Sequence, residues 1–176
     1  MRSLQAFFVR CAEEVISPCC GEKLGAIGTR ARKFIDTLGE WVTLRIRRLR
    51  CPCGRIHHEL PDLIVPYKRY EAACIEKAVS EPLKSSVIAA DDSTIYRWRS
   101  WFREKANYWI GCLISITLRF HQVPVEVQST PSQSAHQRIG RMVGTAVKWL
   151  ARVVRPVVNA NLWIYTRSAC PDQGCL

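Results

Sequence analysis

Residues 41–60 read WVTLRIRRLRCPCGRIHHEL, which is a strand-like run, a tight turn and a second short run. Through Trp41–Leu49 apolar and polar residues alternate, and a period of two residues is typical of a β-strand. The apolar positions of this segment are Val42, Leu44 and Ile46. The positions between them are expected to form a basic outer face and are Thr43, Arg45 and Arg47. At Arg47-Arg48 the alternation slips, which indicates a β-bulge.

Cysteine-glycine pairs mark two tight turns, one at Cys20-Gly21 and one at Cys53-Gly54. Glycine after the cysteine permits the sharp turn that a bulkier residue resists. The second turn leads into a returning strand over Ile56–Leu60. Two cysteine-bearing turns that share one tetrahedral ion define a zinc ribbon. We therefore expect a small zinc-ribbon-like β unit over residues 17–62.

The expected metal ligands depart from the usual ribbon spacing of two residues between the cysteines of each pair. Position 17 is Ser17 where a cysteine would stand, and the second pair, Cys51 and Cys53, is one residue short. The best predicted tetrad is Cys20, Cys51, Cys53 and either His57 or His58, with Cys19 as a substitute. A ribbon that has lost its metal and holds by packing is the alternative. Because no water-activating carboxylate falls within the motif, the zinc would be structural and contribute folding energy.

Positive charge is concentrated around this hairpin. The chain of 176 residues has 26 Lys and Arg against 15 Asp and Glu, a net charge of +11. Residues 23–55 hold nine of the basic residues, opposed only by Asp36 and Glu40. A second basic block runs from Arg103 to the end of the chain. Such an excess favours a polyanionic partner, with nucleic acid first and an anionic membrane surface second.

Outside the ribbon the pattern is mainly helical. We expect an amphipathic helix over 1–16, a linker at Pro61–Tyr67, and helices over 70–79, 83–90, 94–102 and 108–120. Ser93 is the expected N-cap of the third of these. After a polar linker at 129–134, a last helix runs from Ile139 to Val154 and is stopped by Pro156. The expected fold class is therefore α+β, with four units: 1–16, 17–62, 67–128 and 135–169.

Residues 80–102 read as a short helix, a turn and a longer helix, which is the layout of a helix-turn-helix. The apolar residues of the longer helix share one face and are Ile95, Trp98, Trp101 and Phe102. Its other face carries side chains suited to base edges and phosphates, namely Thr94, Tyr96, Arg97, Arg99, Ser100 and Arg103. Arg97 is the best candidate for reading a base, and Arg99 and Arg103 for contacting phosphates. With Arg45, Arg47 and Arg48 of the strand, these residues form the predicted DNA-binding set. An ordinary amphipathic helix with a solvated arginine face is the alternative.

Residues 47–62, 65–70, 93–99 and 161–169 together resemble a bacterial family of uncharacterised transposon-associated proteins. The same layout is similar to the N-terminal DNA-binding region of some insertion-sequence transposases. The resemblance covers roughly residues 17–169. It implies a zinc ribbon followed by a helix-turn-helix, and a ribbon zinc site at positions 17, 20, 51 and 53.

These observations favour a DNA-binding protein, either a transcriptional regulator or an accessory of a mobile element. Its expected protein partner is a second copy of the chain or a transposition protein. An RNA-binding or protein-assembly module built on a zinc ribbon is the alternative. A nuclease needs two or three carboxylates around paired metal ions, and after the helix-turn-helix only Glu104, Glu126 and Asp172 remain. A thiol enzyme using Cys74 or Cys112 is disfavoured because both lie on apolar helical faces. We therefore expect no enzyme and no small-molecule substrate.

The expected location is the cytoplasm. The longest apolar run, Trp109–Leu118, is too short to span a membrane, and Arg10 interrupts the N-terminal apolar residues before they reach the length of a signal peptide. The nine cysteines are an odd number, so without export they are expected as thiols or metal ligands.

Overall fold

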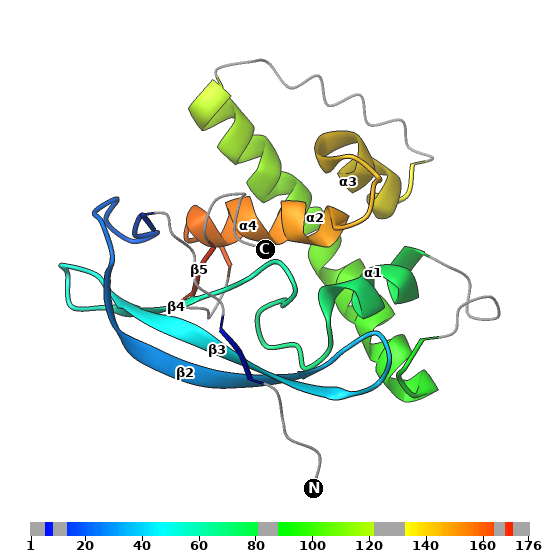
Figure 1. Cartoon of the computed structure of the whole chain (residues 1–176). Coiled ribbons are helices and arrows are strands. Elements are labelled where there is room, and N and C mark those ends of the chain that lie inside the picture. Colours follow the sequence, from blue (N-terminus) through cyan, green and yellow to red (C-terminus); the bar gives the residue numbers. More distant parts are fainter. Residues whose placement is uncertain (1–5, 9–13, 81–87, 122–132, 164–167, 171–176) are drawn as a thin grey trace, which may run out of the picture.

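The computed structural model describes residues 6–8, 14–80, 88–121, 133–163 and 168–170, and it is a mixed α+β fold, as expected. A sheet lies on one side and the helices on the other (Figure 1). The described strands are β1 (Ala6–Phe8), β2 (Gly25–Ile35), β3 (Trp41–Arg50), β4 (Ile56–Glu59) and β5 (Ser168–Ala169). The described helices are α1 (Ala72–Ser80), α2 (Asp92–His121), α3 (Ala135–Val143) and α4 (Trp149–Asn159).

Strand β3 is the centre of the sheet. It pairs along its whole length with antiparallel β2, from Trp41 opposite Ile35 to Arg50 opposite Gly25. Its other edge is shared by β1, which runs parallel to it, and β4, which is antiparallel. Strand β5 adds to β4 in parallel. The predicted strands at 41–49 and 56–60 are thus confirmed, whereas β2 was not predicted.

The predicted irregularity near Arg47-Arg48 lies in the partner strand. The register of β2 shifts between Ala26 and Gly28, opposite Leu49 and Arg48. On β3 itself the slip in the hydrophobic pattern has another cause, because the buried side chains change from one face of the strand to the other along its length. Leu44 and Ile46 join the main core, while Leu49 joins a second cluster with Val15, Leu24 and Cys51.

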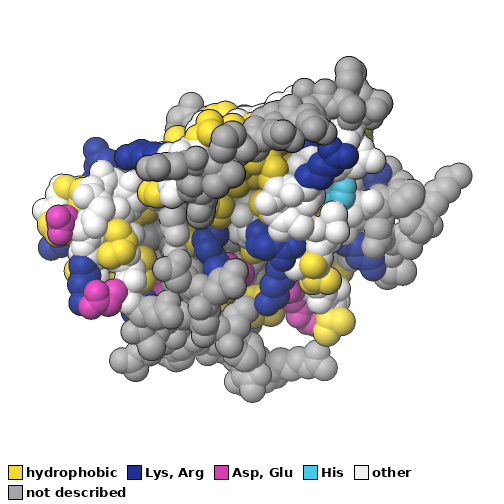
Figure 2. All heavy atoms as spheres, turned by 90° about the horizontal axis from the view of Figure 1, so that it is seen from above, with side chains coloured by type: hydrophobic (Ala, Val, Ile, Leu, Met, Phe, Trp, Pro, Cys, Tyr) yellow, Lys and Arg dark blue, Asp and Glu magenta, His cyan; other side chains and the backbone are white. Residues whose placement is uncertain are grey.

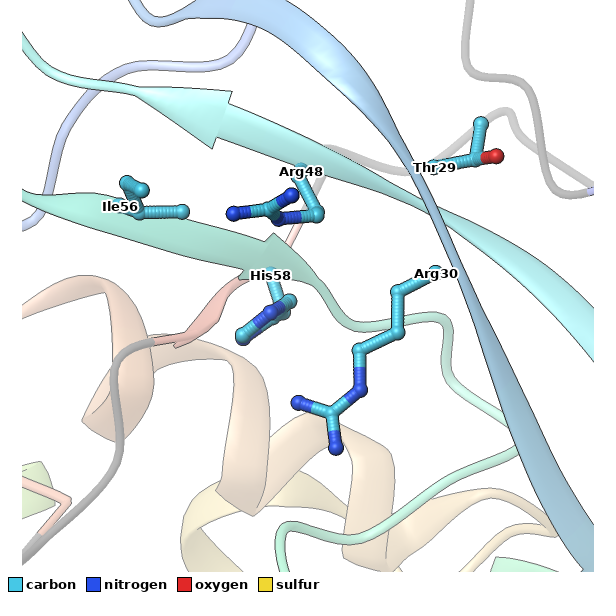
Figure 3. Close-up of a pocket in the computed structure, with 5 residues that line it drawn as sticks. All are labelled: Thr29, Arg30, Arg48, Ile56 and His58. Atoms are coloured by element: carbon cyan, nitrogen blue, oxygen red, sulfur yellow. The ribbon is translucent and has the colours of Figure 1, made fainter.

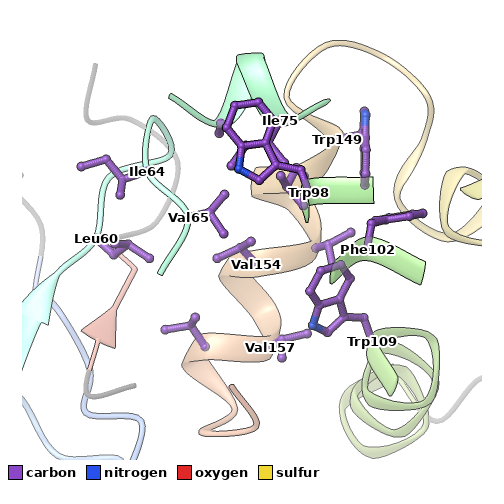
Figure 4. Close-up of a cluster of buried hydrophobic side chains, with 14 of the residues drawn as sticks. Leu60, Ile64, Val65, Ile75, Trp98, Phe102, Trp109, Trp149, Val154 and Val157 are labelled. Carbon is purple, nitrogen blue, oxygen red and sulfur yellow. The ribbon is translucent and has the colours of Figure 1, made fainter. Parts of the chain in front are cut away.

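The main core joins the sheet to the helices. Phe34, Leu44 and Ile46 of the sheet belong to the same buried cluster as residues of α1, α2 and α4. Figure 4 shows Trp98, Phe102 and Trp109 of α2 beside Val154 and Val157 of α4. The predicted linker at 61–67 is largely part of this core, since Pro61, Ile64, Val65 and Pro66 are buried.

Four helix predictions in the N-terminal and central parts differ from the structure or lie partly outside the described residues. Ala6–Phe8 of the expected N-terminal helix form a strand, since β3 offers them an unpaired edge. The expected helices at 94–102 and 108–120 are one helix, α2, whose buried face continues through Ala106 and Trp109. Of the expected short helix at 83–90, residues 83–87 lie outside the described residues and 88–90 are not helical.

The predicted C-terminal helix is two helices. Gly144, with a φ of 80°, ends α3, and Arg152 donates hydrogen bonds to the carbonyl groups of residues 143, 144, 146 and 147, which fixes the turn before α4. Glu76 of α1 accepts bonds from the backbone N–H groups of Lys148 and Leu150 and so caps the start of α4. Pro156 lies inside α4 and does not stop it. Among the described helices none is long and apolar enough to cross a membrane.

Candidate metal centre and basic surfaces

Two backbone turns bring the cysteines together. In the first, the N–H of Gly21 donates to the carbonyl of Ser17 (2.9 Å), and in the second the N–H of Gly54 donates to that of Cys51 (2.9 Å). Both glycines have left-handed backbone angles, with φ of 73° and 85°. The second turn closes one residue sooner than the first, which explains how a shortened Cys51–Cys53 spacing still directs both thiols inward.

The thiols of Cys19, Cys20, Cys51 and Cys53 form a compact cluster, with all four Sγ atoms within 4.8 Å of one another. Cys51 is its centre and lies 2.9 Å from Cys20, 3.0 Å from Cys53 and 3.5 Å from Cys19, measured between Sγ atoms. A tetrahedral zinc with bonds of about 2.3 Å places its sulfur ligands about 3.8 Å apart. A small outward movement of the thiols therefore accommodates such an ion, and the cluster fits a structural metal site.

Ser17 occupies the corner where the resemblance implies a cysteine. Its side chain is 3% exposed, and its Oγ lies 3.0 Å from the Sγ of Cys19 and 3.2 Å from that of Cys51. Cys19, two residues further along the same turn, brings a sulfur to the cluster instead. Sequence reasoning treated Cys19 only as a substitute and missed the contact made by Ser17, although both residues stand in the first turn.

The two candidate histidines lie on opposite faces of β4. Buried His57 faces the thiols, with its Nε2 3.5 Å from the Sγ of Cys19. His58 faces the other way, beside Arg48 and Arg30. Alternation along the strand thus leaves His57 as the histidine close to the cluster and removes His58 from it.

The thiols differ in acidity. The hydrogen bond with Ser17 lowers the pKa of Cys19. Burial raises the pKa of Cys51, but hydrogen bonds with Cys20, Ser17 and Cys53 outweigh this effect and lower it overall. The hydrogen bond that Cys53 donates to Cys51 raises the pKa of Cys53 to about 11. The thiolates of Cys19 and Cys51 therefore form more readily than that of Cys53, and a bound cation would favour the thiolate of Cys53 as well.

The predicted strand arginines have three different environments. Arg45 is exposed, as expected for the outer face. Arg47, expected on the same exposed face, instead forms a two-bond ion pair with fully buried Glu59 of β4 (Nε–Oε2 2.9 Å, NH2–Oε1 2.7 Å). Sequence analysis missed Glu59. Arg48 is half-buried on the opposite face.

The predicted face of α2 is also divided. Tyr96, Arg97 and Arg103 are exposed, and Arg97 donates to the hydroxyl of Ser93 (2.9 Å). Arg99 donates to the carbonyl of Ala78 (2.7 Å) and so ties α2 to α1. Ser100 contacts Glu104 (3.5 Å).

Asp91, and not Ser93, caps α2. Its carboxylate accepts from the N–H of Thr94 (2.8 Å) and from the Thr94 hydroxyl (2.8 Å). The helix accordingly begins at Asp92, two residues before the predicted start, and Ile95, Trp98 and Phe102 are buried as expected.

Cys74 and Cys112 are buried in the main core. Burial raises the pKa of Cys74 to about 11 and also raises that of Cys112. Both thiols are therefore protonated and poorly suited to nucleophilic chemistry. That the chain is not an enzyme stays a prediction.

Residues 17–98, just under half of the chain, match the model of a family described as a domain of unknown function (DUF6431). The match begins at Ser17 in the first cysteine turn and ends at Trp98 in α2, so it includes the whole cysteine cluster. No curated protein and no solved structure matches the chain.

Proposed function

We propose that this chain is a DNA-binding protein in which a zinc-stabilised, ribbon-like sheet unit and α2, as the recognition helix of a helix-turn-helix-like segment, carry the contacts. The observation that carries the proposal is the arrangement of basic residues around the sheet and along α2. Figure 2, which views the molecule from the side of the helices, shows Lys and Arg side chains over several parts of the surface, in greater number than Asp or Glu side chains. DNA phosphates are the polyanion that such a surface fits best.

The zinc of this proposal would be held by Cys19, Cys20, Cys51 and Cys53, with His57 beside them. It would join the loop that precedes β2 to the turn between β3 and β4. The basic strands β2 and β3 lie between these two turns, so the metal would fix the surface that they form. Its role is structural.

The phosphate-binding surface would include the outer side of the β2–β3 hairpin. Lys33 and Arg45 are exposed there, and Arg50 and Arg55 are exposed near the cysteine turn. Within the described part of the chain, the ion pairs with acidic side chains engage other cations, namely Lys23, Arg47 and Arg155. The exposed arginines therefore keep their charge available to a polyanion.

The base-reading surface would be the first three turns of α2. Its apolar side is fixed against the core, with Tyr70 of the preceding segment packed edge-on against Trp98 at 4.9 Å between ring centroids. Its opposite side presents Tyr96, Arg97 and Arg103. A recognition helix needs this division between a packed back and an exposed polar front. Association with a mobile element rests on the sequence resemblance.

DNA binding should be strongly electrostatic. If the hairpin and α2 together neutralise about six phosphates, the logarithm of the association constant should fall with the logarithm of salt concentration at a slope of about −5. Fluorescence anisotropy with a labelled duplex over a salt series measures this slope. A flat response would contradict the proposal, and tighter binding to an RNA duplex of the same sequence would favour the RNA-binding alternative.

Arg97 and Arg45 should affect binding differently. Arg97→Ala should cost about 1–3 kcal/mol on the preferred sequence and little on scrambled duplex, because a base contact discriminates between sequences. Arg45→Ala should weaken both duplexes equally, because a phosphate carries no sequence information. Arg45 replaces Arg47 as the strand control, since Arg47 is held by Glu59. Titrations of both variants on both duplexes test this, and equal losses for Arg97→Ala would remove α2 from base reading.

A further inference from the structure

A pocket of about 440 Å³ opens on the face of the sheet opposite the Arg47–Glu59 ion pair. Its lining comes from three strands and comprises Thr29 and Arg30 of β2, Arg48 of β3, and Ile56 and His58 of β4. Arg48 and His58 are directly opposite each other across the β3–β4 ladder. Figure 3 shows their side chains next to each other, with the Arg30 side chain extending along the same side of the sheet.

Among the described residues, the lining of this pocket is cationic and holds no carboxylate. The acidic residue of β4, Glu59, is bound to Arg47 and is fully buried. Half-buried Arg32 follows Arg30 on the same face of β2, and its buried Nε has no hydrogen-bond partner within the part of the chain that the structure describes. Burial, and then the charges of Arg30, Arg48 and Arg32, lower the pKa of His58. The positive charges of Arg30, Arg32 and Arg48 repel one another, and a bound anion would reduce this repulsion.

We propose that this pocket is a phosphate-binding site in which Arg30 and Arg48 donate paired N–H groups to the phosphate oxygens and His58 donates a third contact. A phosphate presents its oxygens in a tetrahedral arrangement, so two guanidinium groups and an imidazole can approach it from different directions, whereas the two oxygens of a carboxylate lie in one plane. The pocket is larger than a phosphate ion, and Ile56 gives it an apolar side that the group attached to the phosphate would contact. The inference rests on the proposed function in that a nucleic acid would supply the phosphate, either as a terminal monoester or as an internal diester.

Inorganic phosphate is the first probe, added to the full-length, metal-loaded protein and followed by the NMR signals of the His58 ring and by calorimetry. We expect saturable binding, reduced at least tenfold by Arg48→Ala and by Arg30→Ala. Arg30 is exposed, so its variant stays folded even if replacement of half-buried Arg48 disturbs the sheet. Arg45→Ala is the matched control, because it removes the same charge from the other face of β3 and should change phosphate affinity less than twofold.

A 5′-phosphorylated and a 5′-hydroxyl oligonucleotide of the same sequence then distinguish the two sources. Tighter binding of the phosphorylated strand, lost in Arg30→Ala, identifies a terminal phosphate. Equal binding of both strands, weakened equally in Arg30→Ala, identifies an internal phosphodiester.

Absence of saturable phosphate binding, or equal losses of phosphate affinity in Arg30→Ala and Arg45→Ala, would overturn the proposed phosphate site. Neither result would contradict duplex binding or its salt slope. Phosphate binding by a protein that fails to bind any duplex would instead overturn the proposed function and leave the pocket in place.

Discussion

Cys51→Ser should reduce the metal content from about one equivalent per chain to nearly none. Cys51 is the centre of the cluster and is 1% exposed, with Ser17 and three thiols within hydrogen-bond distance. A serine hydroxyl is a poor zinc ligand, and metal binding energy at such a site is folding energy. We therefore expect amide hydrogen exchange to accelerate over residues 14–60 while α2 and α4 stay protected. Native mass spectrometry and exchange measurements together report both effects.

Two further cysteine variants separate loss of metal from loss of packing. Cys53 is exposed, so Cys53→Ser removes a ligand without disturbing the small core and should also release the metal. Cys74→Ser alters a buried thiol outside the cluster and should leave the metal content unchanged. Freshly purified wild-type protein without metal would show that the unit holds by packing alone.

The hairpin of β3 and β4 was predictable because its signals are local. Strand β3 buries Leu44 and Ile46 on one face and exposes Arg45 on the other, so its sequence alternates. Strand β2 escaped prediction because most of Gly25–Lys33 is exposed on both faces. Its extended form depends on pairing with β3, a contact that its own sequence does not encode as a pattern.

The cysteine cluster was predictable from spacing, but its fourth member was not. Which of Cys19, His57 and His58 approaches the other thiols depends on how the first turn closes and on the register of β4. His57 is opposite Leu49 and shares its buried face, whereas His58 is opposite Arg48. That register is set by the short turn at Cys51–Gly54, whose closure could not be derived from spacing alone.

The same register explains why Arg47 does not lie on the exposed face that the alternating pattern predicts for it. Arg45 and Arg47 occupy equivalent positions in the alternating pattern, and sequence alone treats them alike. Strand β4 covers only the end of β3, so Arg47 meets Glu59 while Arg45 stays exposed. Charge on a strand is therefore available to a partner only where no neighbouring strand supplies the opposite charge.

Glu59→Ala should destabilise the protein by about 3–5 kcal/mol, because it leaves the partly buried guanidinium of Arg47 without its counter-charge. The Glu59 side chain is 0% exposed and accepts both bonds that Arg47 donates. Urea denaturation, compared at equal metal content, measures the change in unfolding free energy. The exposed pair of Lys23 and Glu14 provides the control, and Glu14→Ala should change stability little.

Replacing both partners of the buried pair should cost less than replacing either one. In Arg47→Met combined with Glu59→Leu, apolar side chains fill the site and no buried charge is left alone, so much of the lost stability should return. The single variant Arg47→Ala should weaken DNA binding only as far as it lowers the fraction of folded protein, since the native Arg47 side chain is paired with Glu59. If Arg47→Ala stays fully folded yet loses DNA affinity as Arg45→Ala does, Arg47 must leave Glu59 to contact phosphate. The ion pair would then not be the permanent link between β3 and β4 that its geometry indicates.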